Sequence, residues 1–267
     1  KNWEKGFKEY EWRFKHFSQL EFYNRVYNEE KKWDGNKSLK DKRIIVYGEQ
    51  GLGDLIQFIR YVPKLKELGG HVIVHCDKIL DSLIADVSGV DETINPIMSK
   101  SFYPNLIFEN DQKDLPEHDY HCSVMSLPNL LNNFKIVGKP YLKAKSSLSF
   151  KDQEEYKNTF NIGISWAGSP AHSEDHLRST KLKYFKSIYD LPNVKLFSLQ
   201  INMRRKINPD GTTGGFDYEQ KKGTSEPFKR DVDLTEDIED MNIVDMTNLI
   251  ENFDDSANIV SGLDLVI

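Results

Sequence analysis

The first 32 residues show aromatic positions repeating among charged ones. The aromatic side chains recur every three or four residues, which is the spacing of one face of an α-helix. We therefore predict an amphipathic helix at the start of the chain that carries Trp3, Phe7, Tyr10, Phe14 and Phe17. The run Trp33-Asp34-Gly35-Asn36 ends this pattern and predicts a turn.

From about residue 40 the pattern changes to short apolar runs that alternate with amphipathic segments. β-Branched runs predict strands, and segments with a 3.6-residue period predict helices. Such alternation favours a doubly wound parallel sheet. The predicted order is strand 43–47, helix 54–68, a Gly69-Gly70 C-cap, strand 71–76, helix 78–86, strand 90–94 and a further strand at 105–108, and the unit closes near residues 139–142.

A second series of strands and helices follows. Its predicted order is a short helix at 151–158, strand 161–166, polar loop 167–180, helix 181–190, strand 194–200, long loop 202–230, acidic stretch 231–255, a final helix and a terminal strand at 263–267. We find no internal repeat, unless the two halves are distant copies of one design. Because the chain starts in an uncapped helix and stops in an apolar strand, we expect it to be a fragment.

We therefore predict an α/β protein with two Rossmann-like domains, the second truncated at its C-terminus. The predicted divisions are a helical repeat remnant and linker over 1–38, an N-terminal domain over 39–145 and a partial C-terminal domain over 146–267.

Composition limits the class of protein. The net charge of -6 argues against a general nucleic-acid binder. No run approaches the roughly 18 apolar residues that a transmembrane helix needs, and the N-terminus lacks the pattern of a signal peptide. Only Cys76 and Cys122 are present, so we expect no disulfide framework. These observations predict a cytoplasmic protein without nucleic-acid partners and without a transmembrane segment.

The most informative motif is the glycine-rich loop Gly48-Glu49-Gln50-Gly51-Leu52-Gly53-Asp54 between a predicted strand and helix. Such a turn usually binds a nucleotide or phosphate. A P-loop is disfavoured, because Asp54 stands where the lysine is required. A dinucleotide fingerprint is disfavoured by Ile56 at the third glycine position, although Asp77 could serve as the acid that binds ribose.

Asp54 has two interpretations from its chemistry. It could cap the helix N-terminus. A carboxylate at the carboxyl end of a strand could also take a proton from a nucleophilic hydroxyl. The two roles are compatible.

The run from Gly48 to Tyr61 resembles the opening motif of bacterial glycosyltransferases attached to tetratricopeptide repeats, which are related to the heptosyltransferase group (family 9). Further segments resemble the same family in the same order. They are Tyr10–Arg13, Trp33–Gly35, Tyr120–Cys122, Ser126–Pro128, Ile164–His172, Arg178-Ser179, Ser198–Gln200 and Leu263–Ile267.

The resemblance implies a GT-B fold, in which two Rossmann-like domains face each other across a cleft. It implies sugar transfer from a nucleotide-activated donor, with no metal or other cofactor. Asp54 would be the general base on the acceptor side, and the region Ser165–Lys181 would face the donor phosphates. The family continues past the last strand with a serine/aspartate/threonine segment and a helix, which this chain lacks, and loop 202–230 is longer here.

The resemblance also suggests residues that bind substrate. Arg178 and Lys181 would stabilise the diphosphate leaving group, because a site without metal needs cations there. Ser165, Ser169 and His172 would line the same pocket, whereas Trp166 is expected in the core. His121 is either part of the cleft wall or a buried histidine whose hydrogen bonds are satisfied. The remaining predicted substrate-binding residues are Gln50, Gly51, Gly53 and Gln200.

Other histidine and cysteine positions were weighed as a zinc site and disfavoured, because the spacing of His118, His121 and Cys122 fits no standard finger. The aromatic helix would dock upstream helical repeats, which would recruit a protein. Loop 202–230 is either a solvated excursion or a lid over the donor.

The leading hypothesis is therefore a sugar transferase whose acceptor is a glycan, a lipopolysaccharide or lipid-linked sugar, or a protein hydroxyl. Two alternatives belong to other classes: a non-catalytic binding or scaffold domain linked to repeats, and a nicotinamide-dependent oxidoreductase. The sequence does not distinguish the donor sugar or the nucleotide.

Overall fold

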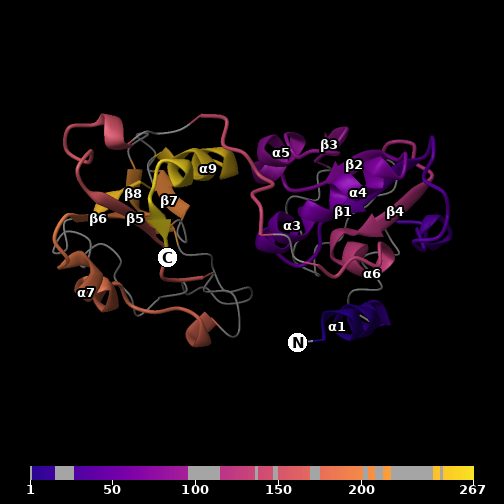
Figure 1. Cartoon of the computed structure of the whole chain (residues 1–267), viewed down its shortest axis with the longest axis horizontal. Coiled ribbons are helices and arrows are strands. Elements are labelled where there is room, and N and C mark those ends of the chain that lie inside the picture. Colours follow the sequence, from indigo (N-terminus) through magenta and orange to yellow (C-terminus); the bar gives the residue numbers. More distant parts are fainter. Residues whose placement is uncertain are drawn as a thin grey trace. The chain divides into compact units, whose positions relative to one another are not determined.

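The structure is a computed structural model that describes residues 2–15, 27–95, 115–135, 138–146, 150–168, 175–200, 204–207, 213–217, 243–246 and 249–267. The chain divides into two compact units, Lys1–Lys143 and Ala144–Ile267. Each unit contains a four-stranded sheet with helices around it (Figure 1).

The sheet of the first unit is entirely parallel. Its strands are β1 (Arg43–Tyr47), β2 (His71–His75), β3 (Glu92–Ile94) and β4 (Tyr120–Ser123), in the spatial order β3-β2-β1-β4. The central strands are buried on both faces: Ile44, Ile45 and Val46 of β1 and residues 72–74 of β2 are all 0% exposed. Continuous burial of this kind explains why these strands read as unbroken apolar runs.

Helices and short turns connect the strands of the first unit. The chain begins with α1 (Trp3–Tyr10) and the 3-10 turn η1 (Glu11–Lys15). The other elements are η2 (Glu29–Lys31), α3 (Leu52–Phe58), η3 (Ile59–Tyr61), α4 (Val62–Glu67), α5 (Lys78–Ala85), η6 (Val124–Ser126) and α6 (Leu127–Leu130). Helix α1 lies against this unit through Phe7, whose ring meets Phe58 edge-on at 5.9 Å.

The sheet of the second unit is also parallel. Its strands are β5 (Phe160–Ile164), β6 (Val194–Ser198), β9 (Val244–Asp245) and β10 (Leu265–Val266), in the order β10-β5-β6-β9. The other elements are η7 (Phe150–Asp152), η8 (Asp175–Leu177), η9 (Leu182–Phe185), α7 (Lys186–Tyr189) and α9 (Phe253–Ser261), with β7 (Arg204–Ile207) and β8 (Thr213–Asp217) forming a separate antiparallel pair.

The two sheets share one strand order among the described strands. In each sheet, the strand that comes first in sequence lies between the second and the fourth strands. The third strand lies beyond the second. This confirms the α/β class and is consistent with two Rossmann-like domains. Within the described residues, no helix has both the length and the apolar character that a bilayer crossing requires.

Several predicted elements need correction. The helix predicted from residue 54 begins at Leu52, and a 3-10 turn interrupts it before Pro63. The helix predicted at 151–158 is wrong: only a 3-10 turn over Phe150–Asp152 forms. The reason is tertiary packing, because the rings of Phe150 and Tyr156 both lie against Phe197, at 4.6 and 5.2 Å.

The long loop predicted at 202–230 is wrong in part, because strands β7 and β8 pair within it. The strand predicted at 105–108 lies outside the described residues. Strand β4 occurs where the sequence pattern predicted none, and it pairs with β1 through His121 opposite Ile45.

Candidate functional site

The first unit has a topological switch point between β1 and β4. The chain leaves β1 toward β2 on one side, whereas β4 lies on the other side. Open α/β sheets bind ligands in the crevice outside the carboxyl ends of strands at such a point. Here the residues at this crevice are the glycine loop 48–54 after β1 and the turn Ser123–Ser126 after β4.

Asp54 lies in the first turn of α3 at this crevice and is half-buried. Its Oδ2 accepts a hydrogen bond from the backbone N–H of Gly51 at 2.9 Å. Asp54 therefore caps the helix, but from its third position, because the N-cap is Gly51. Among the described residues, Oδ1 has no hydrogen-bond partner. That oxygen is available to a substrate hydroxyl, and the role of general base stays a prediction.

The left-handed position of this loop is not a glycine, and the predicted role of Gly51 and Gly53 in substrate binding stays a prediction. Gln50 is the residue in the left-handed region, with φ 64°. A Cβ on Gly51 would lie 3.1 Å from Asp54 Oδ2, whereas a Cβ on Gly53 would have nothing within 4 Å. Gly53 therefore leaves open space beside Asp54, and the side chain of Gln50 donates instead to the hydroxyl of Tyr10.

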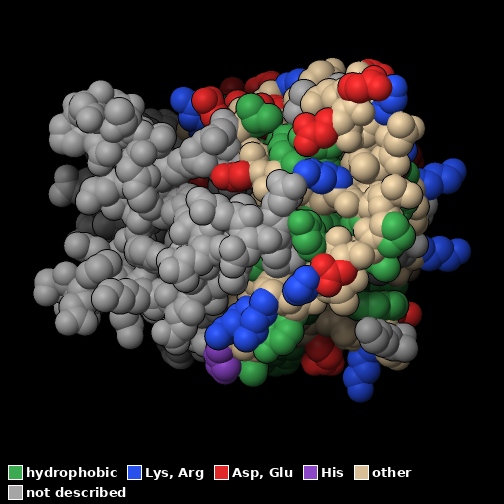
Figure 2. Space-filling model, turned by 90° about the vertical axis from the view of Figure 1, so that its left-hand side faces the viewer, with side chains coloured by type: hydrophobic (Ala, Val, Ile, Leu, Met, Phe, Trp, Pro, Cys, Tyr) green, Lys and Arg blue, Asp and Glu red, His purple; other side chains and the backbone are tan. Residues whose placement is uncertain are grey.

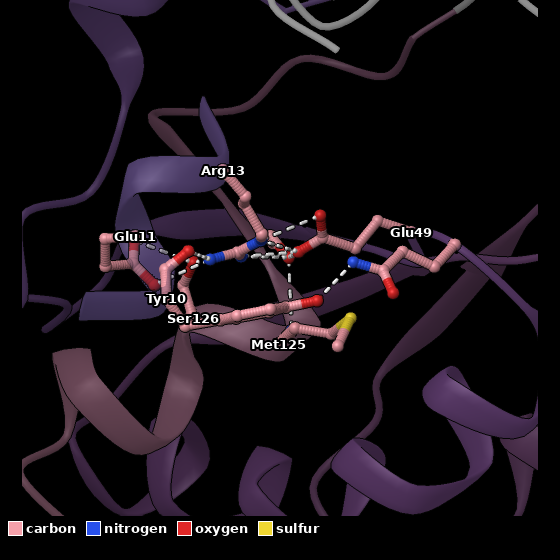
Figure 3. A network of polar contacts seen from close by, with 8 residues as sticks. Tyr10, Glu11, Arg13, Glu49, Met125 and Ser126 are labelled. Atoms are coloured by element: carbon pink, nitrogen blue, oxygen red, sulfur yellow. Dashed lines mark hydrogen bonds and ion pairs between the residues drawn. The ribbon is translucent and has the colours of Figure 1, made fainter. Parts of the chain in front are cut away.

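A buried ion pair that the sequence did not reveal lies at the carboxyl end of β1 (Figure 3). Arg13 extends from η1 to Glu49, the second residue of the glycine loop. Its Nη2 lies 2.5 Å from Glu49 Oε1, and its Nε lies 3.1 Å from both carboxylate oxygens. The side chains of Arg13 and Glu49 are 7% and 0% exposed. Because the two residues are 36 positions apart, no local pattern could have paired them.

The remaining groups of this network are also satisfied. Arg13 Nη1 donates to Tyr10 O and to Glu11 Oε1, at 3.1 and 2.9 Å. Arg13 Nη2 also donates to Ser126 Oγ at 2.8 Å, and the Ser123 hydroxyl donates to Glu49. Burial lowers the pKa of Arg13, but the hydrogen bonds and negative charge of Glu49, with Glu11, outweigh it, so that this pKa is raised. Arg13 therefore stays protonated.

His121 lies in the interior of the first unit. It is 2% exposed, its Nε2 is 2.8 Å from Asn28 O, and its ring centroid is 5.0 Å from that of Tyr27. Burial lowers the pKa of His121 to about 4, so the ring is neutral at pH 7. His121 is therefore buried, but its Nδ1 has no hydrogen-bond partner among the described residues, so the ring is not the fully satisfied histidine of the second interpretation. The described residues contain no group of three or more histidine, cysteine or acidic side chains placed to hold a metal ion.

In the second unit, Gln200 holds the loop that follows β5. Its Oε1 accepts from the N–H groups of Trp166 and Ala167, both at 2.9 Å, and its Nε2 donates to Ala167 O at 2.8 Å. The hydroxyl of Ser165 also lies 3.3 Å from Oε1. Gln200 is 5% exposed, so it acts on the loop rather than on a ligand directly. Trp166 is in the core, as predicted.

The backbone N–H groups of this loop are already paired. Besides the two bonds to Gln200, Ser165 N donates to Ile267 O at 3.0 Å and Gly168 N donates to Ser179 Oγ at 2.9 Å. A phosphate at this edge would therefore be held by side chains, because the loop presents no spare amide between residues 165 and 168. This differs from the backbone cradles of P-loops.

Arg178 lies beside this loop. Its guanidinium packs over Gly168, since a Cβ there would lie 2.5 to 2.7 Å from three guanidinium atoms. Arg178 and Lys181 are both exposed. Figure 2 shows basic side chains beside hydrophobic ones on the face it presents. Ser169 and His172 lie outside the described residues, so their predicted place in this pocket stays a prediction.

The fold defines the class to which the chain belongs: an α/β protein built of two units with parallel, Rossmann-like sheets. Comparisons of the chain with protein-family models, curated proteins and solved structures give no match. The function must therefore be inferred from the residues and their geometry.

Proposed function

We propose that the chain is a glycosyltransferase of the GT-B kind, related to the repeat-linked family that its motifs resemble. One observation carries the proposal. The two units share a strand order, and polar groups of opposite charge follow their first strands: Asp54 after β1 and Arg178 after β5. Transfer from a nucleotide sugar needs a base for the acceptor and a cation for the leaving diphosphate.

In the proposed reaction, Asp54 takes the proton of an acceptor hydroxyl while the oxygen of that hydroxyl attacks the anomeric carbon of the donor sugar. A new glycosidic bond forms, the bond from that carbon to the diphosphate oxygen breaks, and a nucleoside diphosphate leaves. Arg178, with Lys181, neutralises the charge that develops on the diphosphate. The space beside Gly53 would admit the acceptor to the open oxygen of Asp54.

The test measures transfer by the full-length protein from UDP-glucose, UDP-N-acetylglucosamine, GDP-mannose and ADP-heptose, as release of nucleoside diphosphate. Asp54→Asn keeps an oxygen for the cap and should lower kcat by about 10²–10⁴-fold. Asp77→Asn is the matched control, because Asp77 caps α5 after the neighbouring strand through a bond from Ile79 N at 3.0 Å.

Normal turnover by the Asp54→Asn protein would contradict the assignment of the base. If both Asp54→Asn and Asp77→Asn abolish turnover, the effect arises from loss of a helix cap rather than from loss of a general base. A titration with NADH should be flat, and saturable NADH binding would favour the oxidoreductase alternative.

A second candidate is a binding domain without catalysis. The observation that favours it is the Arg13–Glu49 pair, which lies buried at the carboxyl end of β1, where open α/β sheets usually take ligands. Calorimetry with the same four nucleotide sugars separates the candidates, because the binding domain predicts no heat of binding from any of them.

A further inference from the structure

We propose that Arg13 is a positioning residue, which, through Glu49, fixes the glycine loop and thereby the place from which Asp54 acts. The chemical role of Asp54 rests on the proposed function, whereas the placement of the loop does not. A segment at the start of the chain would then be part of the site, although it belongs to neither sheet.

Two consecutive loop residues are tied to the same N-terminal segment. Glu49 is held by Arg13 of η1, and Gln50 donates to the hydroxyl of Tyr10 at the end of α1. The next residue, Gly51, donates its N–H to Asp54 at 2.9 Å. A continuous path therefore leads from Arg13 to the side chain of Glu49, along the backbone to Gly51, and through the Gly51 N–H to the carboxylate of Asp54.

The conformation of the loop needs such support. Gln50 has φ 64°, a left-handed conformation that residues with a Cβ adopt at a cost and keep only where the surroundings hold them. The φ torsion of Gln50 lies between Glu49 and Gln50, and the side chains of these two residues are the ones that bond to the N-terminal segment. Releasing them would let Gln50 relax, and the direction of the Gly51 N–H bond to Asp54 would change with it.

The chemistry of the pair fits a positioning role better than a binding role. Arg13 is already surrounded by two carboxylates, a backbone carbonyl and the hydroxyl of Ser126, so its donors are used. A buried pair with all its hydrogen bonds made defines one geometry, because any other arrangement leaves a buried charge without a partner. The network orders the loop and does not offer an anion site.

The experiment compares four proteins: the unchanged chain, Arg13→Gln, the double variant Arg13→Gln with Glu49→Gln, and Arg43→Gln as control. Arg43 forms a half-exposed ion pair with Glu92 at 3.1 Å, at the other end of β1 from the loop. Hydrogen exchange followed by mass spectrometry reports on residues 48–58. A carbon-13 titration reports on the Asp54 carboxyl, and kcat and KM are measured with the active donor.

For Arg13→Gln we expect at least tenfold faster exchange in residues 48–58, with exchange of β2 unchanged. We also expect kcat to fall at least tenfold at constant donor KM. The acid limb of the pH profile should move to higher pH, because the glycine loop loses the positive charge of Arg13. The double variant, which removes both charges, should recover part of each change, and Arg43→Gln should show none.

Unchanged exchange in residues 48–58 of a folded Arg13→Gln protein would overturn the proposal, as would faster exchange spread evenly over the first unit. If Arg13→Gln does not fold, the double variant decides, because it removes the buried carboxylate of Glu49 and leaves only the partly exposed Glu11 without its partner. If the unchanged chain transfers no sugar, the proposed function fails, while exchange and the Asp54 titration still decide the positioning role.

Discussion

Arg13 Nη2 and Glu49 Oε1 lie 2.5 Å apart, and this contact ties the N-terminal turn η1 to the glycine loop after β1. Breaking one side of such a pair leaves an unpaired buried charge, whereas removing both sides does not. This asymmetry makes the stability of the protein a sensitive probe of the pair.

We expect Arg13→Met to lower the free energy of unfolding of the first unit by about 3–5 kcal/mol, because the buried carboxyl of Glu49 would lose the partner that compensates its burial. Combining Arg13→Met with Glu49→Leu should restore most of that loss. Urea denaturation of the single and double variants measures both values. A single variant as stable as the unchanged chain would show that water or another cation reaches Glu49.

Replacing Gly53 by alanine should separate stability from activity. A Cβ at this position meets nothing within 4 Å, and the residue lies inside the first turn of α3. Alanine should therefore raise the free energy of unfolding by about 0.5–1 kcal/mol through its higher helix propensity. If the open space admits the acceptor, the KM for acceptor should rise at the same time. An increase in stability with unchanged kinetics would place the acceptor elsewhere.

Gln200 should be essential for the loop after β5. Gln200→Ala leaves the buried N–H groups of Trp166 and Ala167 without their acceptor, at a cost of about 1–3 kcal/mol each. Hydrogen exchange of residues 165–168 should become much faster, while the first unit keeps its protection. Ser165→Ala is the control, since its hydroxyl lies 3.3 Å from Gln200 in an exposed position. Equal effects of both variants would argue against this role of Gln200.

The first unit should lose stability in mild acid. Burial lowers the pKa of His75 and of His121 to about 4, whereas an unfolded histidine has a pKa near 6.5. The unfolded chain therefore binds more protons between pH 6.5 and 4, and the free energy of unfolding falls as the pH is lowered through this window. The loss is on the order of 3 kcal/mol for each histidine.

Urea denaturation at a series of pH values measures this slope, with hydrogen exchange assigning the loss to the first unit. His121→Gln retains an amide that can donate to Asn28 O and should reduce the slope. His176→Gln changes an exposed histidine of the second unit and should leave the slope of the first unit as it is. A flat profile between pH 4 and 6.5 would mean that the buried rings gain water or partners when protonated.

Much of the fold was predictable because it depends on short-range patterns. The runs 43–47 and 71–75 are apolar at their centres, over residues 44–46 and 72–74, as expected of strands buried on both faces. Gly69 ends α4 with φ 87°, in agreement with the predicted glycine C-cap. The helix predicted at 151–158 does not form, because the packing of Phe150 and Tyr156 on Phe197 overrides the helical pattern of this segment.

The candidate site was predicted less completely. Asp54 was identified from its place after an apolar strand, and its bond with Gly51 is a local one over three residues. Gln200 was included as a substrate-binding residue, but the structure turns its amide toward the backbone of Trp166 and Ala167. Glu49 was part of the quoted motif, yet nothing in the sequence indicated a role for it.

The amino-acid order alone thus establishes an α/β chain with two strand–helix units and an acidic residue at the first glycine turn, because these features arise from neighbours along the chain. The strand order, the burial of His121 and the pairing of Arg13 with Glu49 arise from contacts between residues far apart in sequence. Such contacts form only when the sheet brings the carboxyl ends of β1 and β4 together, so no local pattern carries them.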